Sequence, residues 1–324
     1  MTKTLLLAGL AASLFATAAG AQDMKSVAIS TIVEVPALTE TRDGVIEGLA
    51  ANGFIEGETI TIDYQNANGN MPTQQQIAKK FAGDRPDVIV SITTPTSQAM
   101  ISTVPKDIPI VFATVTDPIK AKLIDKWEKP GGNITGISDA APIKQQVELM
   151  REVLPDLKTL GFVYNPGLDN AVSTLEKLRA EVEPMGIEVV ESPSPTANEI
   201  IPATRSLVGK VDAIYIPNDT TVVAALESIV KIGQDTDTPI FAGETGAVGR
   251  GVIASVGLDY IGIGKVAGEM AARVLNGENP GEIDSVLGYE MLSDFKVVVN
   301  PPSAAAMGVE LPDTLMQRAT EVIE

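Results

Sequence analysis

Apolar and polar positions follow one another along the chain in a pattern that predicts strands and helices in turn. In the first half, short apolar and β-branched runs typical of strands span 27–33, 59–64, 87–92 and 108–113. Apolar residues at helical spacing occur between them, at 38–51, 74–81 and 96–104. Because strands that are apolar throughout must be buried on both faces, this alternation favours an α/β fold with parallel sheets covered by helices.

The second half repeats the pattern. Its expected strands are 160–164, 187–190, 211–216 and 239–242, and its expected helices are 170–185, 198–209 and 220–233. The run DVIVSITTPT at 87–96 is echoed by DAIYIPNDT at 212–220, and each is followed by a helix and a further strand. This similarity predicts two equivalent α/β lobes. The cleft between them would be lined by the carboxyl ends of the strands, where open α/β sheets bind ligands.

Residues 1–21 carry the features of a secretory signal peptide. Lys3 precedes an apolar stretch at 4–18, and Ala19-Gly20-Ala21 has the small-x-small pattern that signal peptidase reads, which predicts cleavage before Gln22. The stretch is short for a membrane-spanning helix, which needs about 20 apolar residues. No cysteine follows the cleavage point to carry a lipid anchor. We therefore expect an exported protein that is free in the periplasm, with no membrane insertion after cleavage.

The 324 residues include neither cysteine nor histidine, which excludes several kinds of chemistry. A disulfide framework, a Cys zinc site and a thiolate nucleophile all need Cys, and a Ser-His-Asp triad needs His. The formal net charge of −18 argues against nucleic acid as a partner, because phosphate binding needs a basic surface. The sequence has no Asp-x-Asp-x-Asp-Gly calcium loop and no Gly-x-x-x-x-Gly-Lys phosphate loop, so neither a metal nor a cofactor is expected.

Seven segments occur in order along the chain: IVEVPAL (32–38), DYQNANG (63–69), TTPTSQA (93–99), IPIVFA with VTDP (108–118), GNITG (132–136), VDAIYIP (211–217) and GLDY (257–260). Together they resemble the solute-binding proteins of bacterial ABC importers, in the group related to tryptophan- and tyrosine-binding proteins. The resemblance implies a type I periplasmic-binding fold, in which two Rossmann-like lobes close over a small ligand. It also implies a protein without catalytic activity, whose partner is an ABC permease in the inner membrane.

Two positions depart from the usual pattern of that family. Asn218-Asp219 stands where members usually have Asp-Asn, and Glu244 stands where they usually have Asp. Both positions lie at expected ligand contacts, so the family's preference for aromatic amino acids cannot be carried over directly to this chain. Lobe 1 is expected to comprise 22–120 and about 259–288, and lobe 2 about 121–258 and about 289–324, with crossings near 117–138, near 257–260 and after about 288.

Polar residues that follow the predicted strands are the candidate ligand contacts. Thr94, Thr96 and Ser97 lie between a strand and a helix, where hydroxyls and free N–H groups suit a carboxylate, although each is also a residue type that caps helices. Glu34 follows the first strand and Asn165 follows the strand 160–164, so both are expected to extend this polar lining. For Asn165, which precedes a proline, an ordinary turn is the alternative.

Acidic residues at strand ends are the candidates for binding a ligand ammonium group. The candidates are Asp219, Glu244 and Asp117. In a closed cleft their carboxylates would be unpaired, and burying an unpaired charge is costly unless a ligand supplies the positive charge. Helix capping is the alternative role of Asp117 and Asp219. Tyr260 and Trp127 are the candidate aromatic contacts.

These observations predict an extracytoplasmic solute-binding protein of an ABC importer. Its expected ligand is a small zwitterion or carboxylate. Among these an amino acid is the first expectation, and aromatic amino acids belong to the expected class. Two alternatives stay open. One is a ligand-sensing subunit that reports to a membrane receptor. The other is an exported carboxylate-dependent enzyme, which would need two carboxylates facing one substrate bond and for which the sequence shows no local motif.

Overall fold

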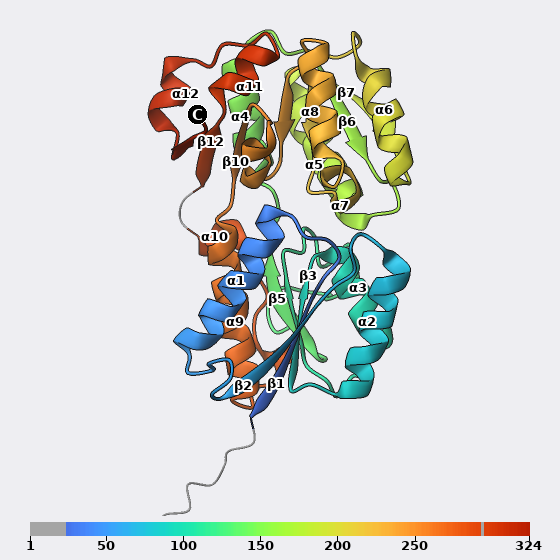
Figure 1. Cartoon of the computed structure of the whole chain (residues 1–324), viewed down its shortest axis with the longest axis vertical. Helices are drawn as coiled ribbons and strands as arrows, with labels where there is room; N and C mark the ends of the chain where they lie inside the picture. The colour runs from blue at the N-terminus through green and yellow to red at the C-terminus, as the bar shows by residue number, and fades with distance from the viewer. Residues whose placement is uncertain (1–23, 293–294) are drawn as a thin grey trace, which may run out of the picture.

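Strands and helices alternate through the residues that the computed structural model describes, 24–292 and 295–324, and they build two α/β lobes (Figure 1). The fold class predicted from the sequence is therefore confirmed. The predicted signal peptide, 1–21, lies outside the described residues. Within the described part of the chain, no helix is both long and apolar enough to cross a membrane.

The first lobe has a six-stranded, wholly parallel sheet in the order β11-β5-β4-β3-β1-β2. Its strands are β1 (Lys25–Thr31), β2 (Ile60–Asn66), β3 (Val88–Ile92), β4 (Ile110–Ala113), β5 (Ile134–Ser138) and β11 (Val286–Leu287). Its helices are α1 (Pro36–Ala51), α2 (Met71–Asp84), α3 (Thr94–Thr103) and α9 (Tyr260–Leu275). Val27 and Ile29 of β1 pack in the core with α1 and α9, whereas Ala28 packs with α2 and α3. Burial on both faces explains why the strands are apolar throughout.

The second lobe has a seven-stranded sheet in the order β13-β12-β10-β9-β8-β6-β7, parallel except where β10 meets β12. Its strands are β6 (Thr159–Tyr164), β7 (Glu188–Pro193), β8 (Ala213–Ile216), β9 (Ile240–Ala242), β10 (Ala254–Gly257), β12 (Lys296–Val299) and β13 (Glu321–Val322). Its helices are α4 (Ile143–Val153), α5 (Asp169–Val182), α6 (Ile200–Leu207), α7 (Thr220–Val223), α8 (Leu226–Asp235), α11 (Pro301–Ala306) and α12 (Asp313–Arg318), with the 3₁₀ helix η3 (Thr245–Arg250) after β9. The predicted helix 220–233 is thus two helices, α7 and α8.

Strand β5 changes the lobe boundary expected from the sequence. It pairs with β4, so residues 121–138 belong to the first lobe and not to the second. A Cβ atom on Gly136 would stand 2.0 Å from the carbonyl oxygen of Phe112, so only glycine lets β5 approach β4 this closely. The glycine interrupts the apolar run, which hides the strand in the sequence. The later crossings lie between β10 and α9, and between α10 (Gly288–Met291) and β12.

Glycines allow α1 and α9 to lie side by side in the first lobe (Figure 1). Gly44 and Gly48 of α1 face Gly264 and Gly268 of α9 with their backbones in contact. A Cβ atom on Gly264 would stand 2.1 Å from the carbonyl oxygen of Thr41 and 2.8 Å from the Cα atom of Gly44. These contacts are backbone contacts, so no side chain can move aside to make room. Helix α9, whose first residue reaches the interlobe region, is positioned by this packing.

The change Gly264→Ala should lower the free energy of unfolding by about 1–3 kcal/mol, because the added methyl group forces α1 and α9 apart. Urea unfolding followed by circular dichroism measures the loss. Gly83→Ala is the matched control: a Cβ atom there meets nothing within 4 Å, and alanine in place of a helical glycine should be neutral or stabilise by about 0.5–1 kcal/mol. Equal effects of the two changes would contradict this account of the helix packing.

Candidate ligand-binding site

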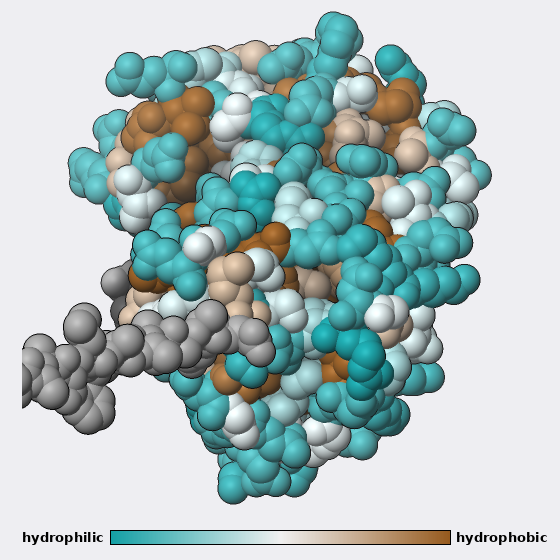
Figure 2. Space-filling view, turned by 60° about the horizontal axis from the view of Figure 1, so that its bottom comes forward, coloured by the Kyte–Doolittle hydropathy of each residue, from teal (hydrophilic) through white to brown (hydrophobic). Residues whose placement is uncertain are grey.

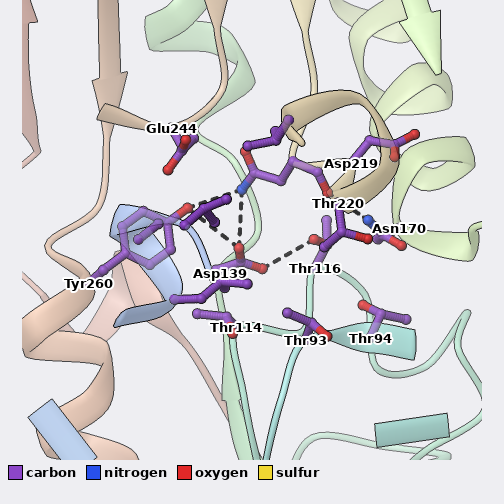
Figure 3. Close-up of a pocket in the computed structure, with 15 residues that line it drawn as sticks. Thr93, Thr94, Thr114, Thr116, Asp139, Asn170, Asp219, Thr220, Glu244 and Tyr260 are labelled. Atoms are coloured by element: carbon purple, nitrogen blue, oxygen red, sulfur yellow. Dashed lines mark hydrogen bonds between the residues drawn. The ribbon is translucent and has the colours of Figure 1, made fainter. Parts of the chain in front are cut away.

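A cavity lies between the two lobes and is lined by residues of both. The first lobe contributes Val35, Ala37, Leu38, Thr93, Thr94, Thr114, Thr116, Asp139 and Tyr260, and the second contributes Asn170, Asn218, Asp219, Thr220, Val223 and Glu244 (Figure 3). Both lobes are therefore needed to form the wall.

The polar part of this wall is built where parallel strands end. Thr93 and Thr94 follow β3, Thr114 and Thr116 follow β4, Asp139 follows β5, Asn218 and Asp219 follow β8, and Glu244 follows β9. Parallel strands end at the same edge of a sheet, so their polar turns meet there. Two of these residues have an unusual backbone: φ is +89° at Thr93 and +51° at Thr114. A β-branched residue at positive φ is strained by about 1–3 kcal/mol, and such strain concentrates at functional sites.

One end of the cavity is formed by the starts of helices α3 and α5, which come from different lobes. Gln98 Nε2 donates to Asp169 Oδ2 at 2.8 Å and joins the two helices there. The Thr94 hydroxyl and the Asn170 Oδ1 atom are buried, and neither has a hydrogen-bond partner among the described residues. The free N–H groups at a helix start favour an anion, and an amide oxygen accepts from a donor. This end, which we call the head end, can therefore hold both charges of a zwitterion.

The other end, which we call the far end, contains Glu244. Its side chain is buried, and both carboxylate oxygens lack a hydrogen-bond partner in the described part of the chain. In Figure 3, Glu244 and Thr94 stand at opposite sides of the group of lining residues. Burial raises the pKa of Glu244 to about 7, the negative charges of Glu40 and Asp139 act in the same direction, and Arg250 acts against them. A ligand donor at this end would pair the carboxylate.

Asp139 connects the lobes between these two ends. It accepts hydrogen bonds from Thr116 Oγ1 at 3.1 Å, from Asn218 Nδ2 at 3.0 Å and from the Tyr260 hydroxyl at 3.5 Å. Asn218 Nδ2 also donates to the Tyr260 hydroxyl at 3.1 Å. Burial raises the pKa of Asp139, whereas these hydrogen bonds lower it. Since Asn218 belongs to the second lobe and its partners to the first, the network holds the two lobes together.

Of the residues predicted from the sequence, Thr94, Asp219, Glu244 and Tyr260 line the cavity. Asp219 is also the N-cap of α7: its carboxylate accepts from the backbone N–H groups of Thr221 and Val222, and from that of Asn165 at 2.6 Å. Its capping role is therefore present in the structure, and a ligand contact for it stays a prediction. Burial raises the pKa of Asp219 to about 6, against the effect of these N–H donors.

Thr96 and Ser97 do not line the cavity, contrary to the sequence prediction. Helix α3 begins at Thr94, two residues earlier than expected, so the next two hydroxyls turn into the first lobe. Thr96 Oγ1 lies 3.0 Å from Thr93 Oγ1, and Ser97 Oγ donates to the carbonyl oxygen of Thr93 at 2.9 Å. Their hydrogen-bonding capacity is used within the lobe.

Glu34, Asp117 and Asn165 are also placed outside the cavity lining. Glu34 is exposed and pairs with Arg42 at 3.2 Å. Asp117 accepts a hydrogen bond from the backbone N–H of Lys120 in its own lobe and another from Ser173 Oγ, at 2.9 Å, across the cleft. It therefore bridges the lobes beside the cavity. The remaining residue, Asn165, bonds through Nδ2 to the Thr221 hydroxyl at 3.1 Å within the second lobe.

Sequence reasoning missed several lining residues, above all Asp139 and Asn170. Asp139 comes directly after the run ITGIS, so recognising that run as a strand would have identified it. The side chain of Asn170 lies at the start of α5, where a capping amide is unremarkable in sequence. Asn218 lies in the lining, as its place at an expected ligand contact of the family implies.

The family model described as "ABC transporter substrate binding protein" matches residues 26–323 of the chain. The chain belongs to this family. A protein named "Tyrosine-binding protein" from Clostridioides difficile (strain R20291) is 37% identical over 286 residues, which cover 88% of this chain and 81% of that protein. The two lobes and their parallel-dominated sheets are similar to those of type I periplasmic-binding proteins.

Two solved structures show which arrangement of lobes this substrate-binding protein has. An ABC domain in complex with L-Trp from Streptococcus pneumonia is 32% identical, with a TM-score of 0.87 over 93% of this chain and 100% of that one. The ligand-free, open structure of a substrate-binding protein with adhesive properties from Clostridium difficile is 37% identical, yet its TM-score is only 0.70, over 93% of this chain and 99% of that one. The lower score despite the higher identity indicates that the lobes here are closed.

Asp219→Ala should lower the free energy of unfolding of the ligand-free substrate-binding protein by about 1–3 kcal/mol, because three backbone N–H groups lose their acceptor. Denaturant unfolding measures this loss. Asp235→Ala is the control, since Asp235 is exposed and forms only an i,i+4 pair with Lys231, for which about 0.5 kcal/mol or less is expected. A stability unchanged by Asp219→Ala would show that the cap contributes nothing.

Proposed function

We propose that this protein is the extracytoplasmic receptor of an ABC importer and that it binds an aromatic L-amino acid between its lobes. On this proposal the signal peptide is cleaved before Gln22, the mature protein works in the periplasm, and the closed, loaded form is recognised by an inner-membrane permease. One relative is named a tyrosine-binding protein, and another was solved in complex with L-Trp. Both support the proposed ligand class. Their similarity covers nearly the whole chain.

The observation that carries the ligand proposal is the distribution of unpaired buried groups over two ends of one cavity. The head end offers the N-terminus of α3 and the Thr94 hydroxyl to a carboxylate, and it offers Asn170 Oδ1 and the carboxylate of Asp219, which also lines the cavity, to an ammonium group. Buried polar groups are normally satisfied, so these atoms indicate what a ligand supplies. Val35, Leu38 and Val223 add apolar surface between the polar groups.

The charge of the lining supports a zwitterion over a simple anion. The residues that line the cavity include three acidic side chains, Asp139, Asp219 and Glu244, and neither Lys nor Arg. A dicarboxylate would bring like charges together without a cation to pair with them. An amino acid brings its own ammonium group, which offsets the acidic lining.

Isothermal titration against the twenty standard amino acids should detect binding of L-Tyr or L-Trp. Thr94→Val should weaken that binding about 10–100-fold, since it removes a hydroxyl that donates to a charged group without changing the side-chain shape. Thr61→Val, an exposed position on β2, is the matched control and should bind like the unchanged protein. If none of the twenty amino acids binds, the amino acid proposal is refuted, while the fold and the family assignment stand.

A further inference from the structure

The far end of the cavity holds a carboxylate whose surroundings come from both lobes. Glu244 belongs to the second lobe, whereas the start of α1 and the ring of Tyr260 belong to the first (Figure 3). A Cβ atom on Gly246 would stand 3.3 Å from Glu244 Oε2 and 3.2 Å from Pro36 Cβ, so α1 covers this corner closely. Closure of the lobes is therefore what removes water from Glu244.

Nothing in the described part of the chain compensates the carboxylate of Glu244 with a hydrogen bond. Arg250 is the cation that acts on it, but Nε and Nη2 of Arg250 are bonded to Glu227, and its buried Nη1 atom forms no hydrogen bond to Glu244. Glu40 on α1 and Asp139 after β5 add negative charge. An ionised Glu244 in the closed cavity without ligand is an unpaired buried charge, and its cost opposes closure.

The position of Glu244 determines which part of a ligand meets it. The ammonium and carboxylate groups of an amino acid leave the same carbon atom, and the head end offers partners for both of them. The side chain then points along the cavity towards the far end. Tyrosine carries a phenol O–H there and tryptophan an indole N–H, whereas phenylalanine ends in an apolar ring.

Resting on the proposed function, we propose that Glu244 opposes closure of the lobes unless a ligand brings a hydrogen-bond donor to the far end of the cavity. A donor pairs the carboxylate and allows the lobes to close. An apolar ring leaves the carboxylate buried and unpaired, and sites built around a buried polar group reject such ligands strongly. Glu244 thereby selects tyrosine and tryptophan over phenylalanine.

The first experiment needs no ligand and measures closure by small-angle X-ray scattering. Because burial raises the pKa of Glu244 to about 7 in the closed form, protonation favours closure below this pH and ionisation opposes it above. The ratio of closed to open protein should therefore fall about tenfold between pH 6 and pH 8. Glu244→Gln should close more at pH 8 and lose this dependence, and Glu188→Gln, exposed on β7, should behave like the unchanged protein.

Two results of the scattering experiment would overturn the proposal. One is a pH dependence that persists in Glu244→Gln. The other is a pH dependence that disappears only in Asp139→Asn, which would assign the effect to the carboxylate in the network with Asn218 and Tyr260. Asp219 is bonded to the backbone of its own lobe, so its surroundings change less on closure.

The second experiment measures selectivity by titration calorimetry with L-Tyr, L-Trp and L-Phe. At pH 8, L-Tyr or L-Trp should bind about 100-fold more tightly than L-Phe, or better. At pH 6 the difference should narrow about tenfold, because protonated Glu244 tolerates the apolar ring. Glu244→Leu should remove the preference, and equal binding of L-Tyr and L-Phe by the unchanged protein would refute it. If none of the three binds, the proposed function fails, while the scattering experiment still decides the role of Glu244.

Discussion

Closure of the two lobes removes water from the polar groups at the strand ends, and the remaining properties of the site depend on this desolvation. Parallel strands end at one edge of each sheet, so the polar turns of both lobes meet in the closed form. Some groups find partners across the cleft, as Asn218 does with Asp139 and Tyr260. Others, such as Thr94 and Glu244, have no hydrogen-bond partner among the described residues. The unpaired groups define what a ligand must bring, because buried polar atoms are rarely left unsatisfied.

Much of this fold could be predicted from the sequence because hydrophobic periodicity and burial have the same cause. Strands covered on both faces are apolar throughout, which makes β1, β3 and β8 easy to recognise. Strand β5 was missed since its contact with β4 requires Gly136, and a glycine inside a short run reads as a loop. The lobe boundary was misplaced for the same reason, because β5 decides to which lobe residues 121–138 belong.

The candidate site could be predicted less completely, because a strand-end residue can serve a ligand or its own backbone. Asp219 shows the difficulty: its carboxylate caps α7 and also lines the cavity, and both roles need an acceptor at a helix start. The prediction for Thr96 and Ser97 depended on the residue at which α3 begins, because a shift of two residues turns their hydroxyls into the lobe. Glu34 follows its strand as expected, but its side chain is exposed and pairs with Arg42.

On the proposed function, neutral donors and closure together would hold the carboxylate of the ligand in a cavity whose lining has neither Lys nor Arg. The start of α3 and the Thr94 hydroxyl carry only partial charges, which interact weakly with an anion in water and much more strongly where water is excluded. Affinity then depends on the lobes being closed, and opening restores water to the same groups. A full cation would hold the carboxylate in the open form as well. For the proposed amino acid ligand, an acidic lining with dipolar donors would therefore couple retention to closure and release to opening.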